Sequence, residues 1–517
     1  MKNKAIEYIK NKTAQTAPSE IRTKPRPQVN TAEVLRNKKV YIMAACGKAM
    51  ATMAALFKEI GFYVRGADSA CFPPMRDIVM SSTDEYYDGY NLEHLKQDEL
   101  VIVGNAITCD NIEFRAVQDQ KIPHMSVSEA LAEFFIKDRK SLVVTGTHGK
   151  TTTTGLLAHV FEVAGKNPGY LIGGVISNNQ KSFSAGMISP DPRHEMSDYF
   201  ITEGDEYNAA LFDRGPKFLH YRPHAVIVTS VEYDHADLYL SMDDYRTAFQ
   251  LMIEEVPQNG LVVLEGDKSS TEYLKQYSGA KVVTYGFGAH NNVRAENVKI
   301  NLEKDCQEFD LVVSGRKILE IQTSLFGDYN ISNILAVCAV ALNEGVFPEK
   351  LAEGVKTFKG MKRRQELVYQ KNGVTVIDDY AHHPTAVALT LKGIKQRYPN
   401  RRIIALFEPY SSTSRSHLFE KPYADAFSAL ADISMFHIPA LTTENPTNFV
   451  NGRSINQHFL DNGKKQDEVY IYEGQPIETL YEQFKKIIRK GDVVVVMASY
   501  KFGNIVEKIQ KDGIDVQ

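Results

Sequence analysis

The chain has 517 residues, a formal net charge of −4 and 43% hydrophobic residues. This composition is typical of an ordinary globular protein, and the near-neutral charge gives no bulk attraction to nucleic acid. No apolar run approaches the roughly 18 residues of a membrane-spanning helix, and the N-terminus lacks the apolar stretch of a secretory signal. We therefore expect a cytoplasmic protein without a membrane partner, and the length predicts about three domains.

The cysteines are scattered along the chain and never form a C-x-x-C pair. An odd number of cysteines without a repeated spacing is typical of reduced thiols, not of a disulfide framework or a zinc site. We therefore expect all five to be reduced. They are Cys46, Cys71, Cys109, Cys306 and Cys338.

The first 37 residues are predicted to be a basic tail, with a short docking helix at Ala5–Ile9 as the alternative to an unstructured segment. The first domain is predicted at 38–138. Its elements follow the order of a dinucleotide-binding fold, in which the ligand lies beyond the carboxyl ends of the strands. These elements are a strand at Val40–Met43, a helix at Met50–Ile60, a strand from Phe62 to Asp68 and a strand at Leu100–Val103.

The second predicted domain, 139–360, opens with a phosphate-binding pattern. An apolar run at Leu142–Val144 predicts a buried strand, and Gly146-x-x-Gly149-Lys150-Thr151 follows it and opens an apolar helix at Leu156–Val163. Backbone N–H groups of such a turn bind phosphate, the lysine reaches the terminal phosphates, and the threonine hydroxyl binds Mg²⁺. The spacing is more compact than G-x-x-x-x-G-K-[ST], because Val144 stands at the first glycine position.

The remaining elements alternate between strand and helix, which favours α/β architecture with mostly parallel sheets. A hinge at Lys359–Arg364 leads into the third predicted domain, 361–517. In the second domain we expect strands at Tyr199–Ile201 and Ala225–Val228, a β-meander over Ala280–Leu325 and a helix at Ile331–Asn343. In the third we expect strands at Val374–Ile377, Arg402–Phe407, Ile433–Phe436 and Val493–Met497.

Polar residues follow two strands of the second domain, where a ligand site is expected. Glu203 and Asp205 come after one strand, and His235 and Asp237 come after the other. Mg²⁺ takes a few protein ligands and leans on substrate phosphates, so Thr151, Glu203 and His235 can hold one or two such ions. For Asp205 and Asp237 the alternative is that they cap the following helices.

The compact phosphate loop and four further motifs occur in order and at suitable distances, and together they resemble the Mur ligase family. The four motifs are Thr-Glu-Gly-Asp-Glu-Tyr at 202–207, Glu-Tyr-Asp-His-Ala-Asp at 232–237, Asn330-x-x-Asn333 and Asp-Tyr-Ala-His-His-Pro-Thr at 379–385. The resemblance implies a Rossmann-like UDP-binding domain, a central P-loop ATPase domain with a mostly parallel sheet and a C-terminal Rossmann-like domain that binds the acceptor.

The resemblance also implies a reaction. Members of the family use ATP and Mg²⁺ to phosphorylate the lactyl carboxylate of UDP-N-acetylmuramate, and an amine then attacks the acyl phosphate. Such transfer needs alignment and neutralisation of charge more than covalent help. The catalytic residues would be Lys150, Glu203 and His235, and the metal ligands Thr151, Glu203 and His235. ATP would bind Gly146, Thr147, His148, Gly149, Lys150, Thr151, Thr152, Asn330, Asn333 and, after domain closure, Arg364.

Two further groups of residues are carried over from the family. The UDP-sugar would bind Gly47, Lys48, Asp68, Pro73 and Asn105, and the acceptor would bind Asp379, His382, His383 and Arg415. Metal binding by the two adjacent histidines is the alternative, although no third ligand stands nearby at a suitable spacing. The expected partners are small molecules only, UDP-N-acetylmuramate and a peptide or amino acid, with no nucleic acid and a monomeric or homodimeric state.

Longer stretches resemble those family members that recycle a cell-wall tripeptide, L-alanyl-γ-D-glutamyl-diaminopimelate. They are 168–175, 210–213 together with 217–223, and Phe407-Glu-Pro409. Free L-alanine as the acceptor, as in the biosynthetic members, is one alternative. A catalytically silent protein that binds the nucleotide sugar is the other.

The chain also departs from the family pattern at several turns. Ala44 stands where a glycine is usual, and its methyl group can forbid a positive φ. Tyr329 replaces a histidine, Tyr410 and Ser412 replace an arginine and an asparagine, and 499–503 replaces a glycine-rich turn. Two of these changes lie in the acceptor domain, so the acceptor's identity is the least constrained expectation.

Overall fold

The computed structural model describes residues 26–72, 75–187, 196–233, 238–239, 241–411, 414–440, 449–500 and 502–514. The alternative docking helix at Ala5–Ile9 lies outside these residues. The chain forms two compact units, the first comprising 1–296, 310–319 and 332–357, and the second comprising 297–309, 320–331 and 358–517. Among the described helices, none combines the length and apolar character needed to cross a bilayer.

The first sheet is parallel and has the strand order β3-β2-β1-β4-β5, which is the predicted dinucleotide-binding arrangement. Its strands are β1 (Lys39–Met43), β2 (Tyr63–Asp68), β3 (Glu85–Asp88), β4 (Leu100–Val103) and β5 (His124–Ser126). Side chains alternate across the sheet, so Val40 and Ile42 pack with one set of helices while Tyr41 and Met43 pack with α5 on the other face. The helices are α2 (Thr31–Asn37), α3 (Lys48–Glu59), α4 (Met75–Ser82), α5 (Ile112–Asp119) and α6 (Val127–Leu131).

The second sheet has ten strands in the order β17-β16-β15-β14-β13-β12-β6-β9-β7-β8. Its centre is β6 (Lys140–Thr145), which pairs in parallel with β12 (Ala225–Val228) and β9 (Tyr199–Gly204). Thr145, at the end of β6, lies opposite both Val228 and Gly204. The residues that follow these three strands therefore emerge at one edge of the sheet.

The other elements around this sheet extend it on both sides. The strands are β7 (Gly169–Leu171), β8 (Phe183–Ser184), β13 (Leu261–Glu265), β14 (Lys281–Gly286), β15 (Val293–Asn301), β16 (Cys306–Val313) and β17 (Arg316–Thr323), and β10 (Asn208–Ala210) and β11 (Asp213–Pro216) form a separate hairpin. The helices are α7 (Lys150–Val163), α8 (Met242–Glu254), α9 (Ser269–Glu272), α10 (Asp328–Asn343) and α11 (Pro348–Thr357).

The predicted meander is wrong at its first step. Strands β14 and β15 pair in parallel, with Tyr285 opposite Val293. The connection between them folds back against Asp267, whose carboxylate accepts hydrogen bonds from the Gly288 amide at 3.0 Å and from the Asn291 side chain at 2.6 Å. The first residues of β15 therefore lie beside the last two residues of β14, and β15 continues in the same direction.

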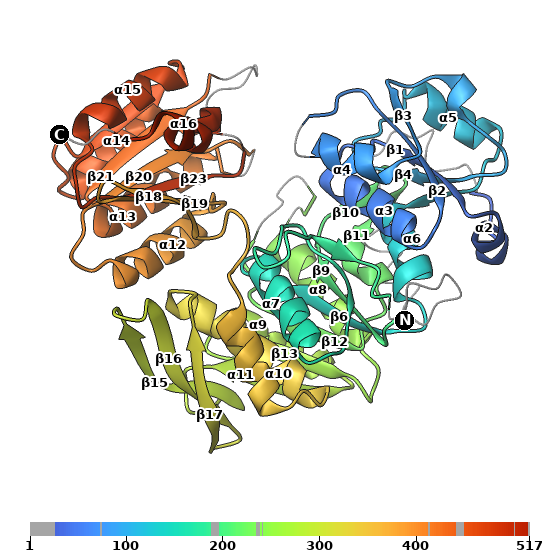
Figure 1. Cartoon of the computed structure of the whole chain (residues 1–517), viewed down its shortest axis with the longest axis horizontal. Helices are drawn as coiled ribbons and strands as arrows, with labels where there is room; N and C mark the ends of the chain where they lie inside the picture. The colour runs from blue at the N-terminus through green and yellow to red at the C-terminus, as the bar shows by residue number, and fades with distance from the viewer. Residues whose placement is uncertain are drawn as a thin grey trace. The chain divides into compact units, whose positions relative to one another are not determined.

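The C-terminal part of the chain is also α/β, as predicted. Its sheet has the strand order β18-β19-β23-β20-β21-β22. Its strands are β18 (Glu366–Lys371), β19 (Val374–Asp379), β20 (Ile403–Glu408), β21 (Ile433–Ile438), β22 (Val469–Glu473) and β23 (Val493–Ala498). One face is covered by α12 (Pro384–Arg397), α13 (Glu420–Leu430) and α14 (Gly452–Asp461), and the other by α15 (Ile477–Ile487) and α16 (Ile505–Asp512) (Figure 1). The return of β23 between β19 and β20 distinguishes this sheet from the first.

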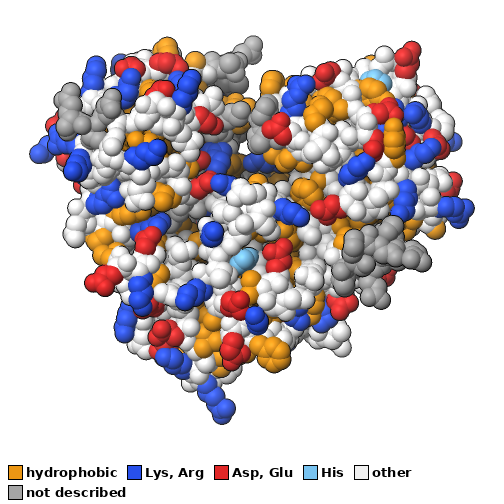
Figure 2. Space-filling model, viewed as in Figure 1, with side chains coloured by type: hydrophobic (Ala, Val, Ile, Leu, Met, Phe, Trp, Pro, Cys, Tyr) orange, Lys and Arg blue, Asp and Glu red, His pale blue; other side chains and the backbone are white. Residues whose placement is uncertain are grey.

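On the face shown in Figure 2, basic and acidic side chains are interspersed. No large field of one sign covers the described part of that face, in keeping with the net charge of −4.

Candidate active site

The turn between β6 and α7 depends on two glycines. Gly146 has φ +120° and Gly149 has φ +84°, a left-handed conformation that L side chains rarely adopt. A Cβ atom at Gly146 would lie 2.3 Å from the Thr229 hydroxyl, and one at Gly149 would lie 2.7 Å from the Asn333 side-chain oxygen. The pattern therefore forms the predicted strand–turn–helix loop, and Asn333 lies directly against it.

The Lys150 side chain is partly buried at this turn, with 14% of its surface exposed. It donates to the Gly146 carbonyl at 2.6 Å and forms an ion pair with the Glu206 carboxylate at 3.0 Å. Burial acts to lower the pKa of Lys150, but the Glu206 and Asp205 carboxylates outweigh it and raise that pKa. The lysine is thus charged and points into the loop, where it can meet a phosphate. The sequence did not predict its pairing with Glu206.

Thr151 and Glu203 come together as predicted. The Thr151 hydroxyl donates to one Glu203 oxygen at 3.0 Å, and the Gly173 amide donates to the other at 2.6 Å. Burial, with the neighbouring Asp205 carboxylate, raises the pKa of Glu203. A hydroxyl and a carboxylate are hard oxygen donors of the kind that Mg²⁺ prefers, so these two side chains fit the predicted metal.

Asp205 does not cap a helix, because β9 leads into the hairpin strand β10. Its carboxylate instead pairs with the Lys217 ammonium at 3.1 Å. Burial acts to raise the pKa of Asp205, but Lys217 and Lys150 outweigh it and lower that pKa. The helix-cap interpretation is therefore wrong for Asp205, and Lys217 is a buried cation that the sequence did not single out.

The remaining loop residues are held by the segment after β12. The Thr147 hydroxyl lies 2.8 Å from both the amide and the carbonyl of Glu232, and the His148 ring lies 3.3 Å from the Glu232 carboxylate. Thr152 is buried in the first turn of α7. His235 and Asp237 lie outside the described residues, so their predicted roles stay predictions.

Asn330 and Asn333 have different surroundings within their own units. The Asn333 side chain lies against Gly149, as described above. The Asn330 amide donates to the Phe326 carbonyl at 2.8 Å. In the described structure Asn330 therefore fixes the start of α10.

The turn after β1 brings part of the predicted UDP-sugar site together. Gly47 is the N-cap of α3, Lys48 is its first residue, and the Asp68 carboxylate accepts from the Cys46 amide at 2.9 Å. Ala44 has φ +58°, so the turn keeps the left-handed conformation despite the added methyl group. This conformation costs an L residue roughly 1–2 kcal/mol.

Two other predicted UDP-sugar ligands have separate outcomes. Asn105 accepts a hydrogen bond from the Asn208 side chain at 3.0 Å, which connects the end of β4 to the hairpin strand β10. Pro73 lies outside the described residues.

The expectation that all five cysteines are reduced is wrong for two of them. Cys46 and Cys71 form a disulfide, and their Cα atoms lie 5.3 Å apart. Their separation of 25 residues in sequence gave no signal, because β2 brings Asp68 and the following loop next to the turn that holds Cys46. The other three are free.

In the C-terminal unit, the predicted acceptor residues follow β19. Asp379 is buried and accepts from the Gln365 amide at 2.8 Å and the Ala381 amide at 2.7 Å. The His382 ring is 3.0 Å from the Tyr380 carbonyl, and His383 caps α12. These contacts hold the loop after β19 in place, and the roles predicted for the two histidines stay predictions.

Two basic residues near this loop contact aromatic rings. The Arg364 guanidinium lies 4.8 Å from the Tyr380 ring centroid. Burial raises the pKa of Asp379, and the charge of Arg364 opposes that rise. The Arg415 guanidinium lies 5.4 Å from the Tyr410 ring centroid. Tyr410 and Tyr500 are half-exposed and stack at 4.8 Å, so two family departures meet beside one predicted acceptor ligand.

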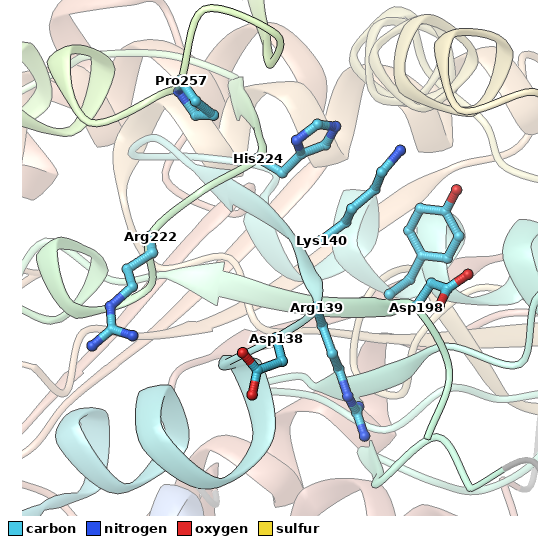
Figure 3. Close-up of a pocket in the computed structure, with 8 residues that line it drawn as sticks. Asp138, Arg139, Lys140, Asp198, Arg222, His224 and Pro257 are labelled. Carbon is cyan, nitrogen blue, oxygen red and sulfur yellow. The ribbon is translucent and has the colours of Figure 1, made fainter. Parts of the chain in front are cut away.

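A pocket of about 520 Å³ lies at the opposite end of β6 and β9 (Figure 3). Lys140 and Tyr199, the first residues of these strands, line it together with His224. Lys140 is paired with Glu344 at 2.7 Å. In Figure 3 the Arg139 and Arg222 side chains point away from each other, so the basic groups do not converge on one ligand position. This pocket is separate from the phosphate loop.

The fold and the loop define an α/β protein with a phosphate-binding loop between β6 and α7. Family models match three successive segments of the chain. Residues 39–139 match the Mur ligase family catalytic domain, 144–341 the Mur ligase middle domain and 363–500 the Mur ligase glutamate ligase domain. The chain belongs to the Mur ligase family. Its members are ATP-dependent ligases that form amide bonds, so the predicted enzyme class is confirmed.

Individual relatives cover nearly the whole chain. The UDP-N-acetylmuramate--L-alanyl-gamma-D-glutamyl-meso-2,6-diaminoheptandioate ligase of Escherichia coli K12 is 32% identical, over 91% of this chain and 97% of that protein. The UDP-N-acetylmuramate--L-alanine ligase of Clostridium acetobutylicum is 29% identical, over 91% and 97%. The crystal structure of a murein peptide ligase from Psychrobacter arcticus has a TM-score of 0.66 at 27% identity and covers 92% of this chain and 98% of its own.

Proposed function

We propose that this ligase joins the tripeptide L-alanyl-γ-D-glutamyl-meso-diaminopimelate to UDP-N-acetylmuramate in cell-wall recycling. The observation that carries the proposal is the convergence of Lys150, Thr151 and Glu203 at one sheet edge. These are the groups that phosphoryl transfer needs: a cation for the terminal phosphates and oxygen ligands for Mg²⁺. The relative from Escherichia coli supports the choice of substrates.

The mechanism follows from the charges. A carboxylate is a poor acylating agent at neutral pH. Its oxygen therefore first attacks the terminal phosphorus of ATP, which gives an acyl phosphate and releases ADP. Lys150 neutralises charge on the transferring group, and the loop amides hold the phosphates. Mg²⁺, held by Thr151 and Glu203 with His235 as a further proposed ligand, would supply charge stabilisation. The acceptor amine then attacks the acyl carbon, and inorganic phosphate leaves.

The division of labour is part of the same proposal. We assign UDP-sugar binding to 38–138 with Gly47, Lys48, Asp68, Pro73 and Asn105, ATP binding to 139–360, and acceptor binding to 361–517. Asp379, His382, His383 and Arg415 would contact the acceptor, and Arg364 would reach the ATP phosphates after closure about the 359–364 hinge. Asn330 and Asn333 would lie near the nucleotide. A cytoplasmic location fits the use of ATP.

Free L-alanine is the second candidate acceptor. The similarity to the alanine ligase of Clostridium acetobutylicum, at 29% identity, favours it. The segments 217–223 and Glu408-Pro409 favour the tripeptide, because they resemble the recycling members.

A panel of acceptors tests the proposal. UDP-N-acetylmuramate, ATP and Mg²⁺ are incubated with the tripeptide, with L-alanyl-γ-D-glutamate and with L-alanine, and products are identified by mass. We expect kcat/KM to be at least 100-fold higher for the tripeptide than for L-alanine. Equal or faster turnover with L-alanine would identify L-alanine, and not the tripeptide, as the acceptor. Tight binding of the UDP-sugar without turnover of any acceptor would indicate a catalytically silent binding protein.

A further inference from the structure

Three carboxylates and two ammonium groups are packed beside the phosphate loop. Glu203, Asp205 and Glu206 lie within four consecutive positions, and the two cations are Lys150 and Lys217. Each lysine has its own acid: Lys150 pairs with Glu206 at 3.0 Å, and Lys217 pairs with Asp205 at 3.1 Å. Glu203 instead accepts from two uncharged donors, Thr151 and Gly173, so its negative charge is the one left for a divalent cation.

Lys217 is held firmly in this arrangement. Its side chain is only 8% exposed, and its ammonium lies 4.1 Å from the centroid of the Tyr207 ring. Its backbone amide donates to the Tyr207 carbonyl at 3.2 Å. The Tyr207 hydroxyl also donates a hydrogen bond to the Asp205 carboxylate, so Lys217, Tyr207 and Asp205 each contact the other two.

The segment that carries Lys217 is anchored at its other end on the first sheet's helices and strands. Phe212 stacks on Phe114 with ring centroids 5.9 Å apart, and Asp213 accepts from the Ser126 hydroxyl at 2.6 Å. Strand β11 then leads directly to the short 3-10 helix Lys217–His220. The position of the Lys217 ammonium is therefore fixed from both sides.

We infer that Lys217 is a positioning residue of this active site: it compensates Asp205, and thereby leaves Glu203 for the metal and Lys150 for the phosphates. Without Lys217, Asp205 would be a partly buried, uncompensated carboxylate next to both groups. Lys150 would then pair with both Glu206 and Asp205, and the Asp205 carboxylate would be a further possible ligand for the metal. This inference rests on the proposed function only for the use of the site, not for the identity of the acceptor.

The test is a double-mutant cycle between Lys217→Met and Asp205→Asn. For Lys217→Met we expect kcat to fall at least tenfold, because Lys150 is partly withheld from ATP. We expect the Mg²⁺ concentration for half-maximal turnover to fall at least threefold, because one more carboxylate faces the metal. Adding Asp205→Asn removes that carboxylate, so the double variant should recover kcat at least fivefold and return to the parent Mg²⁺ dependence. Lys217→Arg should stay within tenfold of the parent.

Lys140→Met is the matched control, because Lys140, the first residue of β6, also pairs with a buried acid, Glu344, away from the phosphate loop. We expect it to lower the melting temperature without changing the Mg²⁺ dependence. A double variant no faster than Lys217→Met, or a Lys217→Met variant with unchanged Mg²⁺ dependence, would overturn the inference. If Lys217→Met does not fold, the double variant alone tests the inference. The inference then requires that the double variant folds and has a kcat within tenfold of the parent's.

The dissociation constant of MgATP, measured by calorimetry on the same variants, separates this inference from the proposed function. Lys217→Met should weaken MgATP binding at least threefold, and the double variant should restore it. Restoration in a parent that joins none of the acceptors would reject the proposed substrates and keep the role of Lys217. Unchanged MgATP affinity in Lys217→Met would reject that role even if the tripeptide is the acceptor.

Discussion

The Lys150 ammonium and the Glu206 carboxylate lie 3.0 Å apart, and the Glu206 side chain is only 1% exposed. An incoming phosphate must therefore replace Glu206 as the ion-pair partner of Lys150. Removing one partner of a buried ion pair costs about 3–5 kcal/mol because the other charge is left uncompensated. For Glu206→Gln we predict a lower melting temperature of the ligand-free protein and a larger upward shift on adding MgATP than in the parent. Equal shifts in the two proteins would show that Glu206 does not compete with phosphate.

Lys150→Ala should separate chemistry from sugar binding. Loss of a preorganised cation aimed at the transferring group lowers turnover by about 10²–10³-fold. The dissociation constant of UDP-N-acetylmuramate, measured by calorimetry, should change less than threefold, because that substrate is assigned to the first sheet. Lys140→Ala is the control for the loss of a lysine from the same strand–helix region. A parallel loss of sugar affinity in Lys150→Ala would contradict the division of labour.

The phosphate loop could be predicted from the sequence because it depends on neighbouring residues. An apolar strand, two glycines and Lys150-Thr151 specify a local geometry, and the structure has it. The pairing of acids with lysines could not be predicted in the same way. Asp205 and Glu206 are adjacent, and only the path of the hairpin determines that Lys217 meets one and Lys150 the other.

Asp378 gives a pH dependence with a definite sign. Burial, opposed by Arg363 at 3.1 Å, raises the pKa of Asp378 to about 6 from 3.8. The folded chain therefore binds this proton more tightly than the unfolded chain, so the associated stability is full below about pH 4 and is lost as the pH rises through 6. The two pKa units correspond to about 3 kcal/mol. We predict that Asp378→Asn flattens the pH dependence of the urea midpoint between pH 4 and 7.

Asp84→Asn provides the comparison with the opposite sign. The pKa of Asp84 is lowered, with its ion pair to Lys58 at 2.6 Å outweighing burial. Its stability is therefore present at neutral pH and lost as the pH falls through the folded pKa. If Asp378→Asn left the urea profile of the parent unchanged, the protonation assigned to Asp378 would be incorrect.

The Cys46–Cys71 disulfide can be tested directly by counting free thiols. Thiol titration of the unfolded, non-reduced chain should find three free thiols, and five after reduction. Closing a loop of this length stabilises a fold by about 3 kcal/mol in the chain-entropy model. We therefore predict that Cys71→Ser lowers the urea midpoint, whereas Cys109→Ser, a change at an exposed free cysteine, does not. Five titratable thiols before reduction would contradict the pairing.

The parts that sequence reasoning missed have local causes. Strand β18, Glu366–Lys371, was not predicted, because its apolar run is only three residues long, 367–369, and is flanked by polar and charged residues. Ala44 was expected to disturb the first turn, but it adopts the left-handed conformation that a glycine would have. At Ala44 the surrounding fold outweighs the preference of the individual residue.

The central claim is that the sugar-borne carboxylate is activated by direct phosphoryl transfer. The most direct measurement uses UDP-N-acetylmuramate labelled with ¹⁸O in both lactyl carboxylate oxygens, together with ATP, Mg²⁺ and the tripeptide, and determines the mass of the inorganic phosphate released. Attack by a carboxylate oxygen on the terminal phosphorus predicts one ¹⁸O atom in each phosphate formed per peptide joined. Unlabelled phosphate released alongside a correctly joined product would contradict the acyl-phosphate account.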